Sequence, residues 1–267
     1  MVFESILFWF AVTTYCISTI VFFIGTVFKK ETLKGIALFV AAIGTIPHLT
    51  SLIIRIIHTG QGPFSTRYEI FSSNALVLML FYLISSYFFK PLRAIGLVVI
   101  PVVFLMMGLS VDTFELKKDV PIIFRSYWLY LHVLFAKAFG ASVIISAGTA
   151  IFYLIKAKTD PEGALRYDLL VYRFLVSSFL FLSVMIIAGS IWAHQSWGRY
   201  WGWDPIEVSS LATWMVIGLI LHLRSIHGWR GKRMAALSFV ALAFTAFTLY
   251  IVTLVVPTIH DAYLVGK

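Results

Sequence analysis

The chain has 267 residues, of which 60% are hydrophobic and 12% charged, and its formal net charge is +9. A water-soluble domain of this length needs more charge to cover its surface, so the composition excludes that class. The positive charge does not indicate nucleic-acid binding, because Lys and Arg stand in short connectors between apolar runs. There they act as topology signals and contact anionic lipid headgroups.

Eight apolar runs long enough to cross a bilayer follow one another along the chain. We place them at about residues 5–28, 35–57, 73–89, 94–110, 128–155, 173–194, 207–224 and 234–256. The predicted fold class is an all-α polytopic membrane protein with about eight transmembrane helices, forming a single domain over residues 1–267. The first run lacks a basic n-region and an A-x-A site, so we expect a span and not a cleaved signal peptide.

The connectors after the first, third, fifth and seventh runs hold 13 of the 21 Lys and Arg residues. The positive-inside rule therefore places these connectors in the cytoplasm and both termini on the external side. Three features then share the outer face: the connector between the sixth and seventh runs, the start of the fifth run with His132, and the segment past the eighth run with His260.

The connector between the sixth and seventh runs reads WAHQSWGRYWGWDP, residues 192–205. Trp and Tyr often gather at membrane interfaces as anchors, which is one interpretation of its rings. Its end also has the pattern of a helix start, with Asp204 as the N-cap, Pro205 at the first position and Glu207 completing a capping box. We expect this capping, but it does not explain the tryptophans.

Five of the eight tryptophans lie between residues 192 and 214, whereas an anchoring belt would spread them over all the span ends. The clustering indicates a shared flat surface, with room beside Gly198 and Gly202 for a broad, planar, apolar ligand such as a porphyrin. Haem iron takes axial imidazoles, and His132 and His260 could supply one to each side. The predicted platform for this ligand consists of Trp192, Trp197, Trp201, Trp203 and Asp204.

The segment WGRYWGWDP resembles the W-G-x-x-W-x-W-D motif (the WWD motif) of the CcsA/ResC-type cytochrome c assembly proteins. SYWLYLHV is similar to the family segment with the first external histidine, here His132. LHLRSIHGWRGKR is similar to its L-H-T-R-x-x-x-G-W-x-G-K stretch, which puts His222 at the intramembrane histidine. GPFSTRYE resembles its P-x-S-x-x-Y-E loop, so the resemblance covers roughly residues 45–265.

This resemblance implies a role in cytochrome c biogenesis. Such proteins carry haem b to an external WWD site and present it, reduced, to the C-x-x-C-H motif of an apocytochrome c, where thioether bonds form. His132 and His260 would be the axial ligands there, and His222 would ligate haem on entry. The expected partner is a separate ResB/CcsB-type membrane subunit, with which the chain would form a holocytochrome c synthase (haem lyase). The expected location is a bacterial cytoplasmic (inner) membrane, with a thylakoid membrane as the alternative.

Four further polar residues are weaker candidates. His48 lies after a proline in the second run and could contact haem or a proton path. His194, where the family commonly has another residue, is either a third ligand or an interfacial side chain. Lys137 and Arg199 are candidate partners for haem propionates.

Two other functions stay open. A protein of the same fold could hold haem b permanently, with His48 and His222 as ligands, as a quinol-linked electron-transfer subunit. A non-catalytic factor that steadies another haem-handling protein is the third hypothesis.

Overall fold

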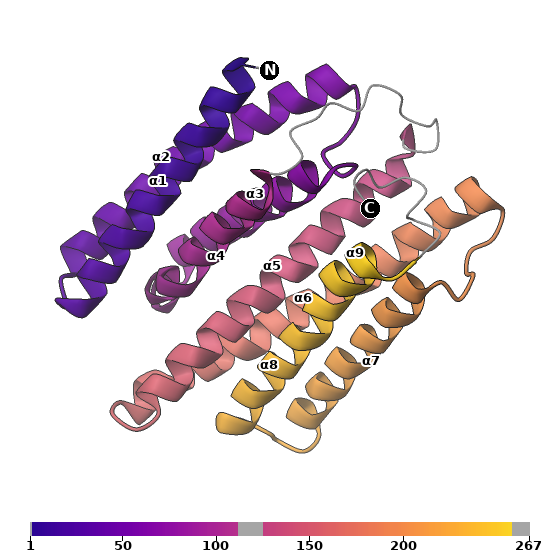
Figure 1. Cartoon of the computed structure of the whole chain (residues 1–267). Helices are drawn as coiled ribbons and strands as arrows, with labels where there is room; N and C mark the ends of the chain where they lie inside the picture. Colours follow the sequence, from indigo (N-terminus) through magenta and orange to yellow (C-terminus); the bar gives the residue numbers. More distant parts are fainter. Residues whose placement is uncertain (1, 112–124, 258–267) are drawn as a thin grey trace. The chain divides into compact units, whose positions relative to one another are not determined.

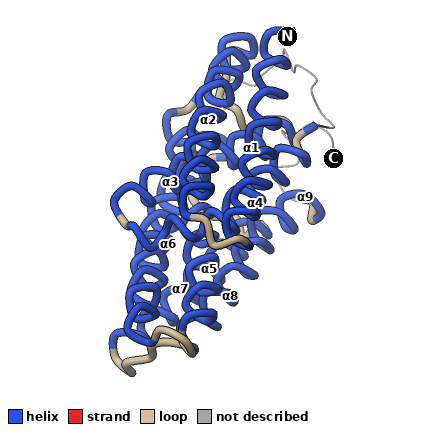
Figure 2. Tube along the Cα trace, turned by 90° about the vertical axis from the view of Figure 1, so that its left-hand side faces the viewer, coloured by secondary structure: helices blue, strands red, loops and turns tan. Residues whose placement is uncertain are grey.

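The computed structural model describes residues 2–111 and 125–257. Every regular element in these residues is a helix (Figure 2). Eight of the described helices are long and apolar enough to cross a membrane, which confirms the predicted all-α class and its eight spans. On which side of the membrane the termini lie stays a prediction.

The spans begin with α1 (Val2–Val27), α2 (Glu31–Thr59), α3 (Arg67–Phe88) and a fourth span in which the short helix η1 (Lys90–Ile95) leads into α4 (Gly96–Leu109). They continue with α5 (Tyr127–Lys156), α6 (Pro161–Trp197), α7 (Pro205–Ser225) and α8 (Lys232–Ala246). The last span ends in the π-helix η4 (Phe247–Val252), which is followed by the short α9 (Thr253–Val255).

Helix α6 begins at Pro161, well before the predicted residue 173. Asp160 caps it by accepting a hydrogen bond from the Gly163 N–H at 2.9 Å, and Pro161 occupies the first position. The same N–H holds the pKa of the Asp160 carboxyl below its usual value. With 37 residues the helix is about 55 Å long and outreaches the apolar core of a bilayer. Its polar first turns therefore escape a prediction based on hydropathy.

The helices fall into two compact units, α1 to α4 and α5 to α9. That the whole chain acts as a single haem-handling domain stays a prediction. In the first unit α1 runs along α2, while α4 packs on α1 and α3 (Figure 1). His48 of α2 is fully buried there, with Nδ1 3.2 Å from the Tyr15 hydroxyl of α1 and Nε2 3.0 Å from the Ser72 hydroxyl of α3. These two contacts join three helices.

In the second unit α5 runs along α6, and α7 and α8 pack on this pair and on each other (Figure 1). The unit has a continuous apolar core, to which all four helices contribute. Its fully buried members include Phe139 and Val143 of α5, Leu175 and Leu182 of α6, Ile217 of α7 and Met234 of α8. This core fixes the register of α5 against α6, on which the candidate site depends.

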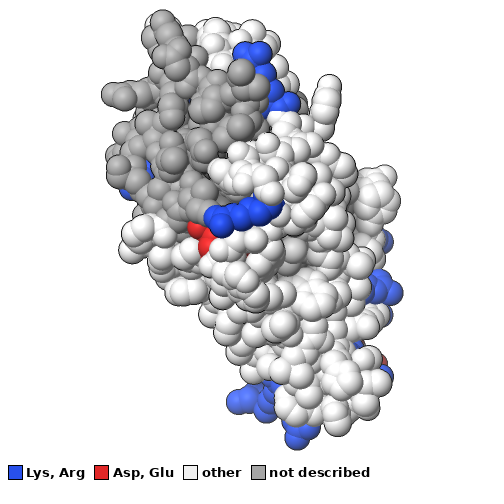
Figure 3. Space-filling view, turned by 90° about the vertical axis from the view of Figure 1, so that its right-hand side faces the viewer, with Lys and Arg blue, Asp and Glu red and all other residues white. Residues whose placement is uncertain are grey.

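The surface is mostly uncharged. In Figure 3 the Lys and Arg side chains stand in separate groups with wide white areas between them. Large apolar side chains such as Phe3, Phe39 and Leu180 are more than half exposed. Helices that face lipid carry such residues outward, because hydrocarbon chains, unlike water, impose no cost on exposed apolar groups.

Candidate functional site

Of the predicted connector, residues 192–197 belong to helix α6, and only residues 198–204 form a loop, the Trp-rich loop, between two capped helix ends. Helix α6 ends at Trp197, and Gly198 follows with φ of 73°, in the left-handed region that favours glycine. At the other end Asp204 is the N-cap of α7, Pro205 takes the first position, and Glu207 completes a capping box. The predicted capping is confirmed.

Glu207 holds this loop closed. Its Oε2 accepts hydrogen bonds from the Gly202 N–H at 2.8 Å and from the Asp204 N–H at 3.1 Å. Asp204 is buried, and its Oδ1 accepts from the Ile206 N–H at 3.0 Å. A Cβ atom at Gly202 would lie 2.9 Å from Cζ of Arg199, so the guanidinium takes the space that we predicted for a ligand beside this glycine.

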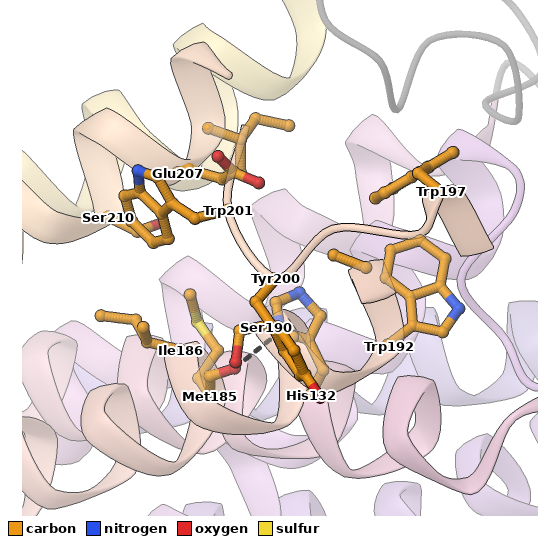
Figure 4. A pocket seen from close by; sticks show the side chains of 13 residues that line it. His132, Met185, Ile186, Ser190, Trp192, Trp197, Tyr200, Trp201, Glu207 and Ser210 are labelled. Atoms are coloured by element: carbon orange, nitrogen blue, oxygen red, sulfur yellow. Dashed lines mark hydrogen bonds between the residues drawn. The ribbon is translucent and has the colours of Figure 1, made fainter. Parts of the chain in front are cut away.

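A pocket lies next to the loop, between α5, α6 and α7 (Figure 4). The space between its lining atoms is about 430 Å³, a figure that includes space open to solvent. Most of its lining is apolar or aromatic. The lining residues are His132, Met185, Ile186, Gly189, Ser190, Trp192, Ala193, Trp197, Tyr200, Trp201, Ile206, Glu207 and Ser210.

Three of the four predicted platform tryptophans line this pocket. Trp192 is buried and meets Trp197 edge to face, with ring centroids 5.0 Å apart. Trp201 lines the side towards α7 (Figure 4). Trp203 is not among the lining residues; the residue is 71% exposed, and its ring meets that of Trp201 edge to face with centroids 5.9 Å apart. Its φ of 58° is unusual for a residue with a side chain.

His132 lies near the start of α5 and lines the pocket from that side. Its Nδ1 is 2.9 Å from the backbone oxygen of Met185 in α6, drawn as the dashed line in Figure 4. A carbonyl oxygen can only accept, so Nδ1 carries a hydrogen, and in the neutral imidazole the lone pair then lies on Nε2. The ring also stacks on Trp192, with centroids 6.4 Å apart and planes 23° from parallel. A histidine that binds a metal through one ring nitrogen commonly donates the hydrogen of the other nitrogen to a carbonyl or carboxylate oxygen, as Nδ1 of His132 does here.

Ser210 of α7 brings a polar group to the pocket. Its side chain is 3% exposed, and its Oγ has no hydrogen-bond partner among the described residues. A buried hydroxyl normally has a partner, so this group can serve a bound molecule or water. Ser210 could not be singled out from the sequence, because serines are common along these helices and only the packing shows which of them faces the pocket.

The other predicted histidines lie elsewhere. His260 falls outside the described residues, so its place opposite His132 stays a prediction. His222 is exposed in the last turn of α7, and its ring lies 5.9 Å from that of His227. His194 is exposed too and stacks on Tyr200, with centroids 4.2 Å apart. His194 does not line the pocket, which favours the interfacial interpretation over that of a third ligand.

Lys137 and His48 do not line the pocket either. Lys137 is half-buried on α5, in the turn that follows His132. His48 belongs to the first unit, where both of its ring nitrogens have hydroxyl partners. These contacts favour a structural role for His48.

Asp168 was missed by the sequence analysis. Its carboxylate is buried on α6 and faces Arg224 of α7, with a shortest N–O distance of 2.8 Å. It also accepts the Gly231 N–H at 2.6 Å, while Arg224 donates to the Trp229 carbonyl at 3.3 Å. The motif R-x-x-x-G-W-x-G therefore builds the turn between α7 and α8. Asp168 stands in the polar connector before the predicted sixth run, where no sequence pattern marks it as buried.

The motif GPFSTRYE, in the first unit, also builds a connection between two helices. Glu69 caps α3 together with Thr66, and its Oε1 accepts from Nε of the fully buried Arg55 at 2.9 Å. Arg55 also lies 3.6 Å from Glu4 of α1 and above the Tyr68 ring. A buried Arg between two carboxylates thus fixes the loop that precedes α3.

The family described as Cytochrome C assembly protein matches residues 2–260. The Cytochrome c biogenesis protein CcsA of Chlamydomonas reinhardtii is 31% identical over 225 residues, covering 79% of this chain and 63% of the relative. That of Guillardia theta is 29% identical over 267 residues, covering 86% and 87%, and that of Synechococcus sp. (strain CC9902) is 26% identical over 259 residues, covering 82% and 83%. The chain thus spans less than two thirds of the Chlamydomonas protein.

A solved structure shares the fold. Cytochrome c Heme Lyase CcmF superposes with a TM-score of 0.74 over 93% of this chain and 46% of that chain, at 14% sequence identity. The chain spans about half of that larger protein. At this identity the likeness concerns the arrangement of the helices alone.

Proposed function

Because the chain belongs to the cytochrome c assembly protein family, we propose that it acts in cytochrome c biogenesis by holding haem b in the pocket beside the Trp-rich loop. The haem is a substrate, presented to an apocytochrome c for attachment. The observation that carries this proposal is the His132 ring, which lines the pocket with its hydrogen on Nδ1 and its lone pair on Nε2.

The chemical character of the lining residues suits a haem. Aromatic and aliphatic side chains suit the apolar faces of a porphyrin, and the pocket's tryptophans offer flat contact surfaces. The single cysteine, Cys16, lies on α1 and not in the pocket, so this site would hold haem without a covalent bond. A substrate that must be handed on requires such reversible binding.

The chain's own residues would contribute by positioning the haem for the reaction. His132 orients the iron, Trp192 and Trp197 exclude water from one side, and the closed loop keeps these groups in place. The vinyl groups would then meet the thiols of a C-x-x-C-H motif. Each addition forms one C–S bond, and the thiol hydrogen moves to the other vinyl carbon. Holding both reactants in this geometry lowers the barrier, since association entropy is already lost on binding.

The finer assignments belong to the same proposal. His260 would be the second axial ligand, and His222 the ligand met by haem on entry. Arg199, a residue of the loop, would pair with a propionate. The proposed partner is a ResB/CcsB-type membrane subunit, and together the two would act as a holocytochrome c synthase. Relatives from algae and a cyanobacterium make a thylakoid membrane as suitable a location as a bacterial cytoplasmic membrane.

The electron-transfer hypothesis gains no support from the contacts of His48. That hypothesis needs His48 as a permanent ligand, and both of its ring nitrogens already have hydroxyl partners. His222 alone would supply only one of the two axial ligands that a permanently bound haem b needs in this hypothesis.

The first experiment compares visible spectra of the full chain, purified in detergent together with its membrane partner. We expect bound haem b in the unaltered protein and at least about tenfold less in His132→Ala. His194→Ala is the control, because that exposed ring does not line the pocket and its loss should leave haem unchanged. Full haem content in His132→Ala would refute the proposed site, and loss of haem in His194→Ala would move the ligand there.

A further inference from the structure

Three positions of α6 define the surroundings of the His132 ring: the Met185 carbonyl, Gly189 and Trp192. Their spacing of four and three residues puts all of them on one face of the helix. The Met185 carbonyl accepts a hydrogen bond from Nδ1–H of His132, and Trp192 stacks on the ring. Gly189 lies between these two contacts along the helix. The ring is therefore held by α6, although it is carried by α5.

Gly189 is the position that permits this contact. A Cβ atom there would lie 2.5 Å from Nδ1 and 2.9 Å from Cε1 of His132, closer than real Cβ atoms approach other atoms. Because the obstacle is the ring itself, any larger residue would push the imidazole away from α6. By contrast, a Cβ at Gly35 of α2 would meet nothing within 4 Å.

Glycine is otherwise a poor choice in the middle of a helix, since alanine is favoured there. Residue 189 lies well inside α6, two turns before its end at Trp197. Its backbone is helical, so no unusual φ requires glycine at this position. The close approach of the His132 ring is the remaining reason for its absent side chain.

We propose that Gly189 is a positioning residue for haem binding. Its missing side chain lets Nδ1–H of His132 reach the Met185 carbonyl, which sets the tautomer and aims the Nε2 lone pair at the iron. This inference rests on the proposed function. Groups that orient a metal-binding histidine in this way typically change metal affinity by about 10–100-fold when lost.

The test compares haem content and the visible spectrum of four proteins: Gly189→Ala, His132→Ala, the double variant and the control Gly35→Ala. Each is the full chain purified with its membrane partner. We expect Gly189→Ala to bind haem about 10–100-fold more weakly and to lose the low-spin spectrum of a two-histidine site. Added imidazole should restore that spectrum, because it replaces the displaced ring. Gly35→Ala should match the unaltered protein.

The double variant separates a role through His132 from a general packing role. If Gly189 acts only through the ring, the double variant binds haem as His132→Ala does, and the two effects are not additive. A further loss in the double variant would overturn the inference. So would normal haem in Gly189→Ala beside lost haem in His132→Ala. Normal haem in His132→Ala would instead refute the proposed function.

Gly189→Ala could also fail to accumulate in the membrane. In that case the double variant decides, because removing the imidazole removes the clash with the added methyl group. Recovered accumulation of the double variant supports the contact. Continued failure shows that residue 189 is constrained by something other than His132 and overturns the inference.

Discussion

The closed Trp-rich loop depends on one carboxylate, so Glu207→Ala is expected to open it. The carboxylate accepts two backbone N–H groups, at Gly202 and Asp204. Hydrogen bonds to a charged group contribute about 1.5–3 kcal/mol each. Gly202 and Glu207 are half-buried, so water can replace part of the loss, and we take the lower value for both bonds. The loop should therefore lose about 3 kcal/mol, or roughly 100-fold in its closed-to-open equilibrium.

Amide hydrogen exchange of the peptide spanning residues 198–206 measures this opening directly. Exchange in Glu207→Ala should be about 100-fold faster than in the unaltered protein, and bound haem should fall with it. Asp204→Asn is the control, because asparagine caps a helix about as well as aspartate. Unchanged exchange in Glu207→Ala would refute the reasoning, since it would mean that the loop holds its shape without the two hydrogen bonds.

Two further predictions concern residues outside the pocket. Asp168→Asn should destabilise the turn at residues 226–231 by about 3 kcal/mol, because it deprives the nearly buried Arg224 of its charged partner. Trypsin should then cleave this turn faster than in Asp160→Asn, whose altered carboxylate is exposed; equal rates would show that the ion pair adds no stability. His48→Phe should lower accumulation in the membrane, because it leaves the buried Ser72 hydroxyl without its imidazole partner at a cost of about 1–3 kcal/mol, while the Tyr15 hydroxyl keeps Thr45. Haem per protein should stay unchanged, and a selective loss of haem would make His48 a ligand.

The spans could be predicted from the sequence because the bilayer imposes a strong requirement. About 20 consecutive apolar residues are needed to cross it, and the chain contains eight such runs. The helix ends were harder to predict. Helix α6 continues into polar residues as far as Pro161, since a helix that leaves the bilayer keeps its own hydrogen bonds and no longer needs apolar side chains.

The local part of the site could also be predicted. Asp204, Pro205 and Glu207 interact within a few residues of one another, so their spacing alone indicates the cap. The backbone of Trp203 could not be predicted, because residues other than glycine rarely adopt its positive φ. The ion pair between Asp168 and Arg224 could not be predicted either, because 56 residues separate the two partners along the chain.

By itself the sequence determined the all-α membrane class, the positions of the eight spans and the capped aromatic loop. All of these depend on composition or on neighbours along the chain. Only the tertiary structure decided which tryptophans line the pocket and how His132 is held. The Met185 carbonyl and Gly189 carry no distinguishing side chain, so no residue pattern marks them. Their importance comes from the register in which α5 packs on α6, which the apolar core of the second unit sets.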